Sequence, residues 1–248
     1  LRLATSVPPV DPDGDPPAPK LFRGNYVKLE QWQIFTNNGA GPGFNTAKLN
    51  EIFNNELKIT PSIRGIKWAF NWGQIEDVIT GVANWNWAPI DELCQRLWNL
   101  RTGPNPVKKR LMLAFGFKQD GVTNADRLAL MPPDLTDRVW TFSEVPYDPN
   151  NPNNPAHTPD GFYPKLWDAT VQSRILNFMI QLGNHVVPGT DGLPLDQGDL
   201  LCMMGTLESA TRNPYLGSYS GGSLAQYQNG IINTTGSSVI KSMKIGLP

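Results

Sequence analysis

The chain has 248 residues, of which 40% are hydrophobic and 17% are charged, and its formal net charge is -1. This length allows one well-buried core, or one domain with an appendage. The 21 Lys and Arg residues are scattered, which argues against nucleic acid as a partner, and no apolar run approaches the roughly 18 residues of a membrane span.

The first 62 residues divide into two segments ahead of the main pattern. Residues 1–24 are rich in proline and predict an extended strap without chemistry of its own. Residues 25–62 predict a lead-in segment that packs on the main domain, with a strand after Tyr26 and a short amphipathic helix over Asn45–Leu57. The chain opens at Leu1 without Met, which is consistent with processing and predicts a secreted or cell-surface protein.

Strand and helix patterns alternate from residue 63 onward. Ile66–Trp72 and Arg110–Phe117 predict two strands covered on both faces, and Pro89–Leu100 predicts the amphipathic helix between them. A strand, helix and strand joined by short loops form a right-handed parallel crossover. The pattern therefore predicts an α/β fold over residues 63–248.

The later units follow a long interruption. Residues 118–162 predict an irregular insertion, because proline, asparagine and glycine dominate them. Asp168–Gly183 predicts the clearest helix, and Asp199–Ala210 predicts a strand that ends near Glu208. A carboxylate at the end of a buried strand is a candidate catalytic acid; the alternative is a solvated side chain that pairs with Arg212.

Several other kinds of site find little support in the sequence. Cys94 and Cys202 lie in apolar segments without metal-ligand spacing, which favours two free thiols over a disulfide. His157 and His185 have too few neighbouring ligands to indicate a metal site, and no phosphate loop or nucleophile elbow occurs. The sequence predicts no cofactor.

Four segments together resemble a known clan of enzymes. They are GIKWAFNWGQIED, NWNWAPIDEL, YPKLWDATVQSRILNFMIQLG and LLCMMGTLESA, and they are similar to the opening half of retaining (β/α)8-barrel glycoside hydrolases, the clan of cellulases, mannanases and β-galactosidases. The resemblance implies a TIM-barrel-like fold of which the first four or so strand-helix units are present. It also implies that Glu208, at the end of the fourth strand, protonates the leaving oxygen. Leu207 stands where the clan has Asn.

The resemblance implies an oligo- or polysaccharide as substrate. The clan's nucleophile belongs to the seventh strand, so the missing half of the barrel would come from a longer chain or from a partner chain. The alternative is a non-catalytic carbohydrate-binding or structural protein of a surface or virion assembly, built on a partial barrel.

Candidate sugar-binding residues gather around the first predicted strand of this domain. Trp72 and Trp85 are candidates because pyranose rings pack on aromatic faces, and Lys67 and Asn71 are polar residues on the opposite side of the strand from Trp68 and Trp72. Trp68 is expected in the core.

Three acidic residues are candidates for a second carboxylate: Glu76, Asp120 and Glu144. Retaining chemistry needs the two carboxyl groups about 5 to 5.5 Å apart, and inverting chemistry about 6.5 to 9.5 Å. The alternative for each of the three is a solvated loop charge.

Overall fold

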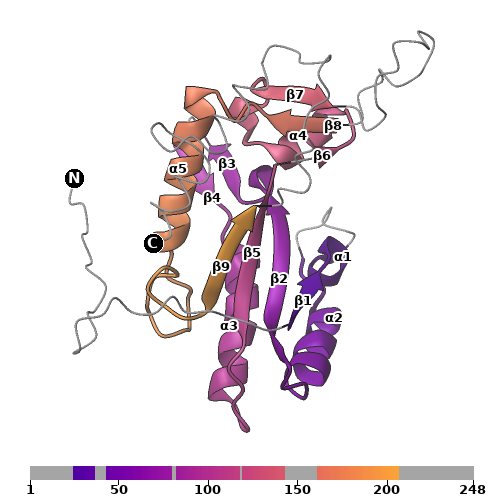
Figure 1. Cartoon of the computed structure of the whole chain (residues 1–248), viewed down its shortest axis with the longest axis vertical. Coiled ribbons are helices and arrows are strands. Elements are labelled where there is room, and N and C mark those ends of the chain that lie inside the picture. The colour runs from indigo at the N-terminus through magenta and orange to yellow at the C-terminus, as the bar shows by residue number, and fades with distance from the viewer. Residues whose placement is uncertain (1–24, 37–42, 80–81, 118, 143–160, 207–248) are drawn as a thin grey trace.

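A computed structural model describes residues 25–36, 43–79, 82–117, 119–142 and 161–206. Its centre is a parallel sheet of four strands: β1 (Asn25–Leu29), β2 (Ile63–Asn71), β5 (Arg110–Gly116) and β9 (Leu201–Thr206). The strands lie side by side in their chain order, with β1 and β9 at the edges (Figure 1). The predicted α/β class is confirmed, and the described sheet is open and not closed into a barrel.

Helical segments connect consecutive strands of this sheet. They are α1 (Gln31–Ile34), α2 (Thr46–Asn50) with the π-helix η2 (Glu51–Leu57), α3 (Ala88–Thr102) and α5 (Ala169–Asn184). The three predicted helices are therefore confirmed, within one or two residues at their ends. The side chain of Asp168 caps α5 by accepting from the backbone N–H groups of Thr170 and Val171 at 2.9 and 3.2 Å.

One face of the sheet carries the hydrophobic core. Trp68, Phe70 and Phe115 are at most 1% exposed, and the ring of Phe178 on α5 lies 6.1 Å from Phe70 and 5.2 Å from Phe115. The buried side chains of α2, η2 and α3 belong to the same cluster, so these helices and α5 cover the same face. In Figure 1, α3 lies behind the sheet.

The other face of the sheet is less covered than predicted. Lys67, Ala69 and Met112 are half-buried, and Met203 is 49% exposed. The expectation that Ile66–Trp72 is buried on both faces is therefore wrong for the face of Lys67, whereas the placement of Trp68 in the core is confirmed.

Residues 25–62 contribute to the main sheet itself. Val27 and Leu29 of β1 are in register with Ile66 and Trp68 of β2, and Leu49, Ile52, Phe53 and Leu57 of the following helices are buried. Because β1 is a full member of the sheet, β9 is its fourth strand in chain order.

Smaller elements gather at the carboxyl end of the sheet. Two form a hairpin, β3 (Glu76–Ile79) and β4 (Val82–Trp85), and three form an antiparallel sheet in the order β6-β8-β7, made of β6 (Gln119–Asp120), β7 (Val139–Phe142) and β8 (Gly161–Pro164). The helix α4 (Asn124–Leu130) and the 3-10 turns η3 (Trp72–Gln74) and η4 (Pro133–Leu135) complete this group. Figure 1 shows the second sheet beyond the tips of β2 and β5.

The prediction of an irregular insertion over residues 118–162 is therefore wrong for its described parts. α4 also packs tightly on the turn after β2: a Cβ on Gly73 would lie 1.9 Å from the carbonyl oxygen of Leu128. Only glycine allows this approach.

Two further expectations are settled among the described residues. Cys94 and Cys202 are free thiols, as predicted, although Cys202 is only half-buried. No described helix is long and apolar enough to cross a membrane.

Candidate functional site

A polar group lies where β2 and β5 end. The side chain of Asn71 donates from Nδ2 to Oε1 of Gln119 at 2.7 Å, and the backbone N–H of Asn71 donates to Oε1 of Gln74 at 2.9 Å. Asn71 is in register with Gly116, and its Oδ1 lies 2.2 Å from where a Cβ on Gly116 would be. Glycine at position 116 therefore leaves the space that the Asn71 carboxamide occupies.

This group offers carboxamides, and the carboxylate of Asp126 contacts the side chain of Gln119. A carboxamide both donates and accepts hydrogen bonds, which is the capacity that sugar hydroxyls require of a partner. Asn71 and Gln119 are half-buried, so each retains some contact with solvent. The carboxyl end of parallel strands is also where barrel enzymes collect their reacting groups.

A second group lies on the core side of the same strand ends. Glu76, at the start of β3, is 0% exposed, and its Oε2 accepts a hydrogen bond from the indole Nε1 of Trp72 at 2.5 Å. Its Oε1 accepts from two guanidinium nitrogens of Arg174 on α5, with Nε at 2.9 Å. Nη1 of Arg174 donates to Asp134 in η4 at 2.8 Å.

Burial dominates the electrostatics of Glu76. Removal from water raises the pKa of its carboxyl above the ordinary value, while the hydrogen bonds from Arg174 and Trp72 act in the opposite direction. All of its strong partners are internal, and the residue joins β3, η3, α5 and η4. The geometry indicates a role in holding these elements together.

Trp72 and Trp85 differ in their surroundings. Trp72 is 0% exposed and meets Phe115 edge to face at 6.1 Å, so its ring presents no face to solvent. Trp85 is half-buried and stacks on Trp87 at 5.6 Å between ring centres. Trp87 in turn stacks on His185, whose Nε2 lies 2.6 Å from Oδ1 of Asp91. Trp85 thus belongs to an aromatic row that links β4 to the end of α5.

The remaining candidates are dispersed. Lys67 lies in the middle of β2 on the less covered face, in register with Lys28 and Met112. Asp120 is exposed in β6. Glu144 and Glu208, together with Leu207, lie outside the described residues.

The structure thus brings Asn71, Trp72 and Glu76 to one end of the sheet, on two different sides of it. Two of their partners, Gln119 and Arg174, had no local signal in the sequence. Arg174 lies beside the apolar stripe of α5, and Gln119 is 48 residues from Asn71 in the chain, so only the folded chain connects them.

No group of three or more His, Cys, Asp and Glu residues in the described ranges could hold a metal ion. Comparisons with protein-family models, curated proteins and solved structures gave no match for this chain, so the site is assigned from its own residues.

Proposed function

We propose that the protein is a glycoside hydrolase that cleaves β-linked sugars on a (β/α)8-type scaffold, with Glu208 as general acid and base. Glu208 protonates the leaving oxygen, and a second carboxylate, for which Asp120 and Glu144 are the candidates, attacks the anomeric carbon or activates the water that attacks it. The sheet topology supports the scaffold. Its four parallel strands follow one another in chain order, and the connecting helices share a core on one face. A barrel is wound in this way, whereas a doubly wound sheet reverses its strand order and carries helices on both faces.

The observation that carries the proposal is the position of β9. It is the fourth strand of the sheet, and Glu208 follows its last residue, Thr206, by two positions in the sequence. In the clan that this chain resembles, the acid follows the fourth strand. Thr206 of β9 is in register with Phe115 of β5, and the next residue of β5, Gly116, is in register with Asn71 of β2. The end of β9 and the Asn71 carboxamide therefore lie at the same end of the sheet, with only β5 between their strands.

The described polar residues then divide into two roles. Asn71 and Gln119 hydrogen-bond substrate hydroxyls beside the scissile bond, on the less covered side of the sheet. Trp72, Glu76 and Arg174 hold the surrounding elements from the core side. A general acid near neutral pH needs a raised pKa, and closure of a sugar over the strand ends provides the desolvation that raises it.

The test is hydrolysis of a panel of β-linked oligosaccharides of glucose, mannose, xylose and galactose by the wild type, Glu208→Gln and Glu56→Gln. Glu56 is an exposed residue of η2 and serves as the matched control. We expect Glu208→Gln to lower kcat by about 10²- to 10⁴-fold through the loss of proton transfer, with unchanged circular dichroism. Glu56→Gln should retain wild-type activity.

Two results would overturn the proposal. Hydrolysis by Glu208→Gln at the wild-type rate would remove Glu208 from the chemistry. A wild-type protein that binds these sugars in calorimetry but releases no product would instead favour a non-catalytic carbohydrate-binding protein.

A further inference from the structure

A cleft of about 220 Å³ lies between the first helical unit and α3, away from the carboxyl end of the sheet. Its lining from α2, η2 and the following residue comprises Asn50, Phe53, Asn54 and Lys58. From α3 and the residues that follow it come Arg96, Asn99, Leu100, Gly103 and Pro104. The cleft has polar walls over an apolar floor, because Phe53 and Leu100 are 2% and 8% exposed.

The wall formed by η2 has an unusual backbone. Glu51–Leu57 is a π-helix, and the N–H of Lys58 closes it by bonding to the carbonyl of Phe53 at 3.1 Å. π-Helical turns are rare and occur often at functional sites. This one presents Phe53, Asn54 and Lys58 to the same cleft.

The charge of the lining is entirely positive. Lys58 and Arg96 are its ionisable residues, and no Asp or Glu lines it. Arg96 uses Nε for Glu92 and Nη1 for Asn50, each at 2.7 Å. Within the described ranges, the Lys58 ammonium and Nη2 of Arg96 make no hydrogen bond or ion pair.

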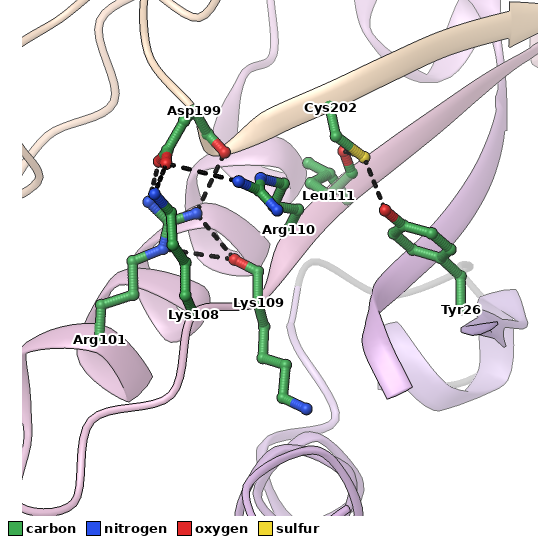
Figure 2. A network of polar contacts seen from close by, with 8 residues as sticks. All are labelled: Tyr26, Arg101, Lys108, Lys109, Arg110, Leu111, Asp199 and Cys202. Atoms are coloured by element: carbon green, nitrogen blue, oxygen red, sulfur yellow. Dashed lines mark hydrogen bonds and ion pairs between the residues drawn. The ribbon is translucent and has the colours of Figure 1, made fainter. Parts of the chain in front are cut away.

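More cations lie at the amino end of the sheet, where β5 begins (Figure 2). The carboxylate of Asp199 is paired with Arg101 and Lys108, and lies 3.8 Å from Arg110. The ammonium of Lys109, the residue after Lys108, donates to the carbonyl of Thr60, two residues after Lys58, at 2.8 Å. An excess of cations over carboxylates raises the local potential that an anion meets.

From these features we infer that the cleft binds a phosphate or sulfate group, free or carried by a sugar. Lys58 and Arg96 donate to the oxyanion, since ammonium and guanidinium groups form strong charge-assisted hydrogen bonds with such oxygens. Asn54 and Asn99 supply carboxamides for further oxygens or hydroxyls. Phe53 and Leu100 lie buried beneath these groups, and the Arg96 guanidinium lies over the Phe53 ring at 5.8 Å, so the polar walls make the contacts with the ligand.

The experiment is isothermal titration calorimetry on the 248-residue protein at low ionic strength. The probes are inorganic phosphate, sulfate, glucose 6-phosphate and glucose. We expect saturable binding of phosphate and sulfate, and none of glucose. Tighter binding of glucose 6-phosphate than of phosphate identifies a sugar-borne group as the preferred form, whereas equal affinity identifies the free anion; both agree with the proposal.

Variants test whether the residues of the cleft, and not the positive potential of the wider surface, bind the anion. Lys58→Gln should weaken phosphate binding by at least about tenfold, whereas Lys108→Gln, 59% exposed and outside the cleft, should weaken it by less than about threefold. Asn99→Asp adds a negative charge to the lining at an exposed position, and it should weaken phosphate binding as much as Lys58→Gln does. Because a change at an exposed position is tolerated by the fold, this second variant shows that a loss of binding does not come from misfolding. The inference is overturned if phosphate and sulfate do not bind saturably, or if the two lysine variants lose affinity equally.

Discussion

Two carboxylates bound by arginine lie at opposite ends of the sheet, and their surroundings differ. At the carboxyl end, Glu76 is 0% exposed and contacts Arg174 and an indole N–H. At the amino end, the side chain of Asp199 is 27% exposed and shares its partners with solvent. Water screens an exposed pair, whereas a buried charge depends on its partner. Removal of one partner of the pair should therefore cost far more stability at the carboxyl end than at the amino end.

The largest expected effect tests this directly at Arg174. Arg174→Met leaves the Glu76 carboxyl buried without its cation and should lower the free energy of unfolding by about 3 kcal/mol in urea denaturation. Arg138→Met is the matched control, because Arg138 is 42% exposed where it pairs with Asp168; it should cost less than about 1 kcal/mol. Equal costs for the two variants would mean that burial does not separate these pairs.

The next effect concerns the contact that attaches α4 to the turn after β2. Gly73→Ala places a Cβ against the carbonyl of Leu128 and should lower the free energy of unfolding by about 2 kcal/mol, because backbone must move. The matched control is Gly205→Ala in β9, where the nearest atom lies 4.0 Å from the new Cβ and the change should stay within about 0.5 kcal/mol. Thermal denaturation of both variants measures the difference, and a neutral Gly73→Ala would show that α4 packs more loosely than described.

The smallest effect is at the amino end. Burial tends to raise the pKa of Asp199, but the hydrogen bonds from Lys108 and Arg101 prevail and hold it below its usual range. A lowered pKa in the folded state stabilises the protein above the unfolded pKa, and this contribution disappears as the pH falls through the folded pKa. Asp199→Asn should therefore cost about 1 kcal/mol at pH 7 and progressively less below pH about 4. A cost that is independent of pH would contradict this assignment of charge.

The principal elements could be predicted because their signals are local. The stripe of Val171, Ile175 and Phe178 predicts α5, and the apolar run before Gly116 predicts β5. The small sheet could not be predicted in the same way, because β6 has only two residues. Its partner in β8 is also distant in the sequence: Gln119 pairs with Phe162.

The candidate site was predictable in its location but not in its pairings. Asn71 is the last residue of β2 and Glu76 lies five positions later, so their presence at the carboxyl end follows from parallel topology. Whether Glu76 is solvated or enclosed depends on Arg174, 98 residues later, and on how α5 crosses the sheet. The catalytic role of Glu208, on which the proposed activity depends, remains a prediction from the sequence.

The π-helix has a consequence for how this protein tolerates changes in length. A π-helical turn holds more residues than an α-helical turn, so η2 is equivalent to an α-helix that has gained a residue. Removal of Asn55, an exposed residue of this turn, would let α2 and η2 continue as one regular helix. Because the π-helical turn already takes up the extra residue, the side chains after the deletion would keep nearly the same direction about the axis relative to those before it. Lys58 would therefore stay on the cleft after a deletion that, in a regular α-helix, would turn it by about 100° about the axis.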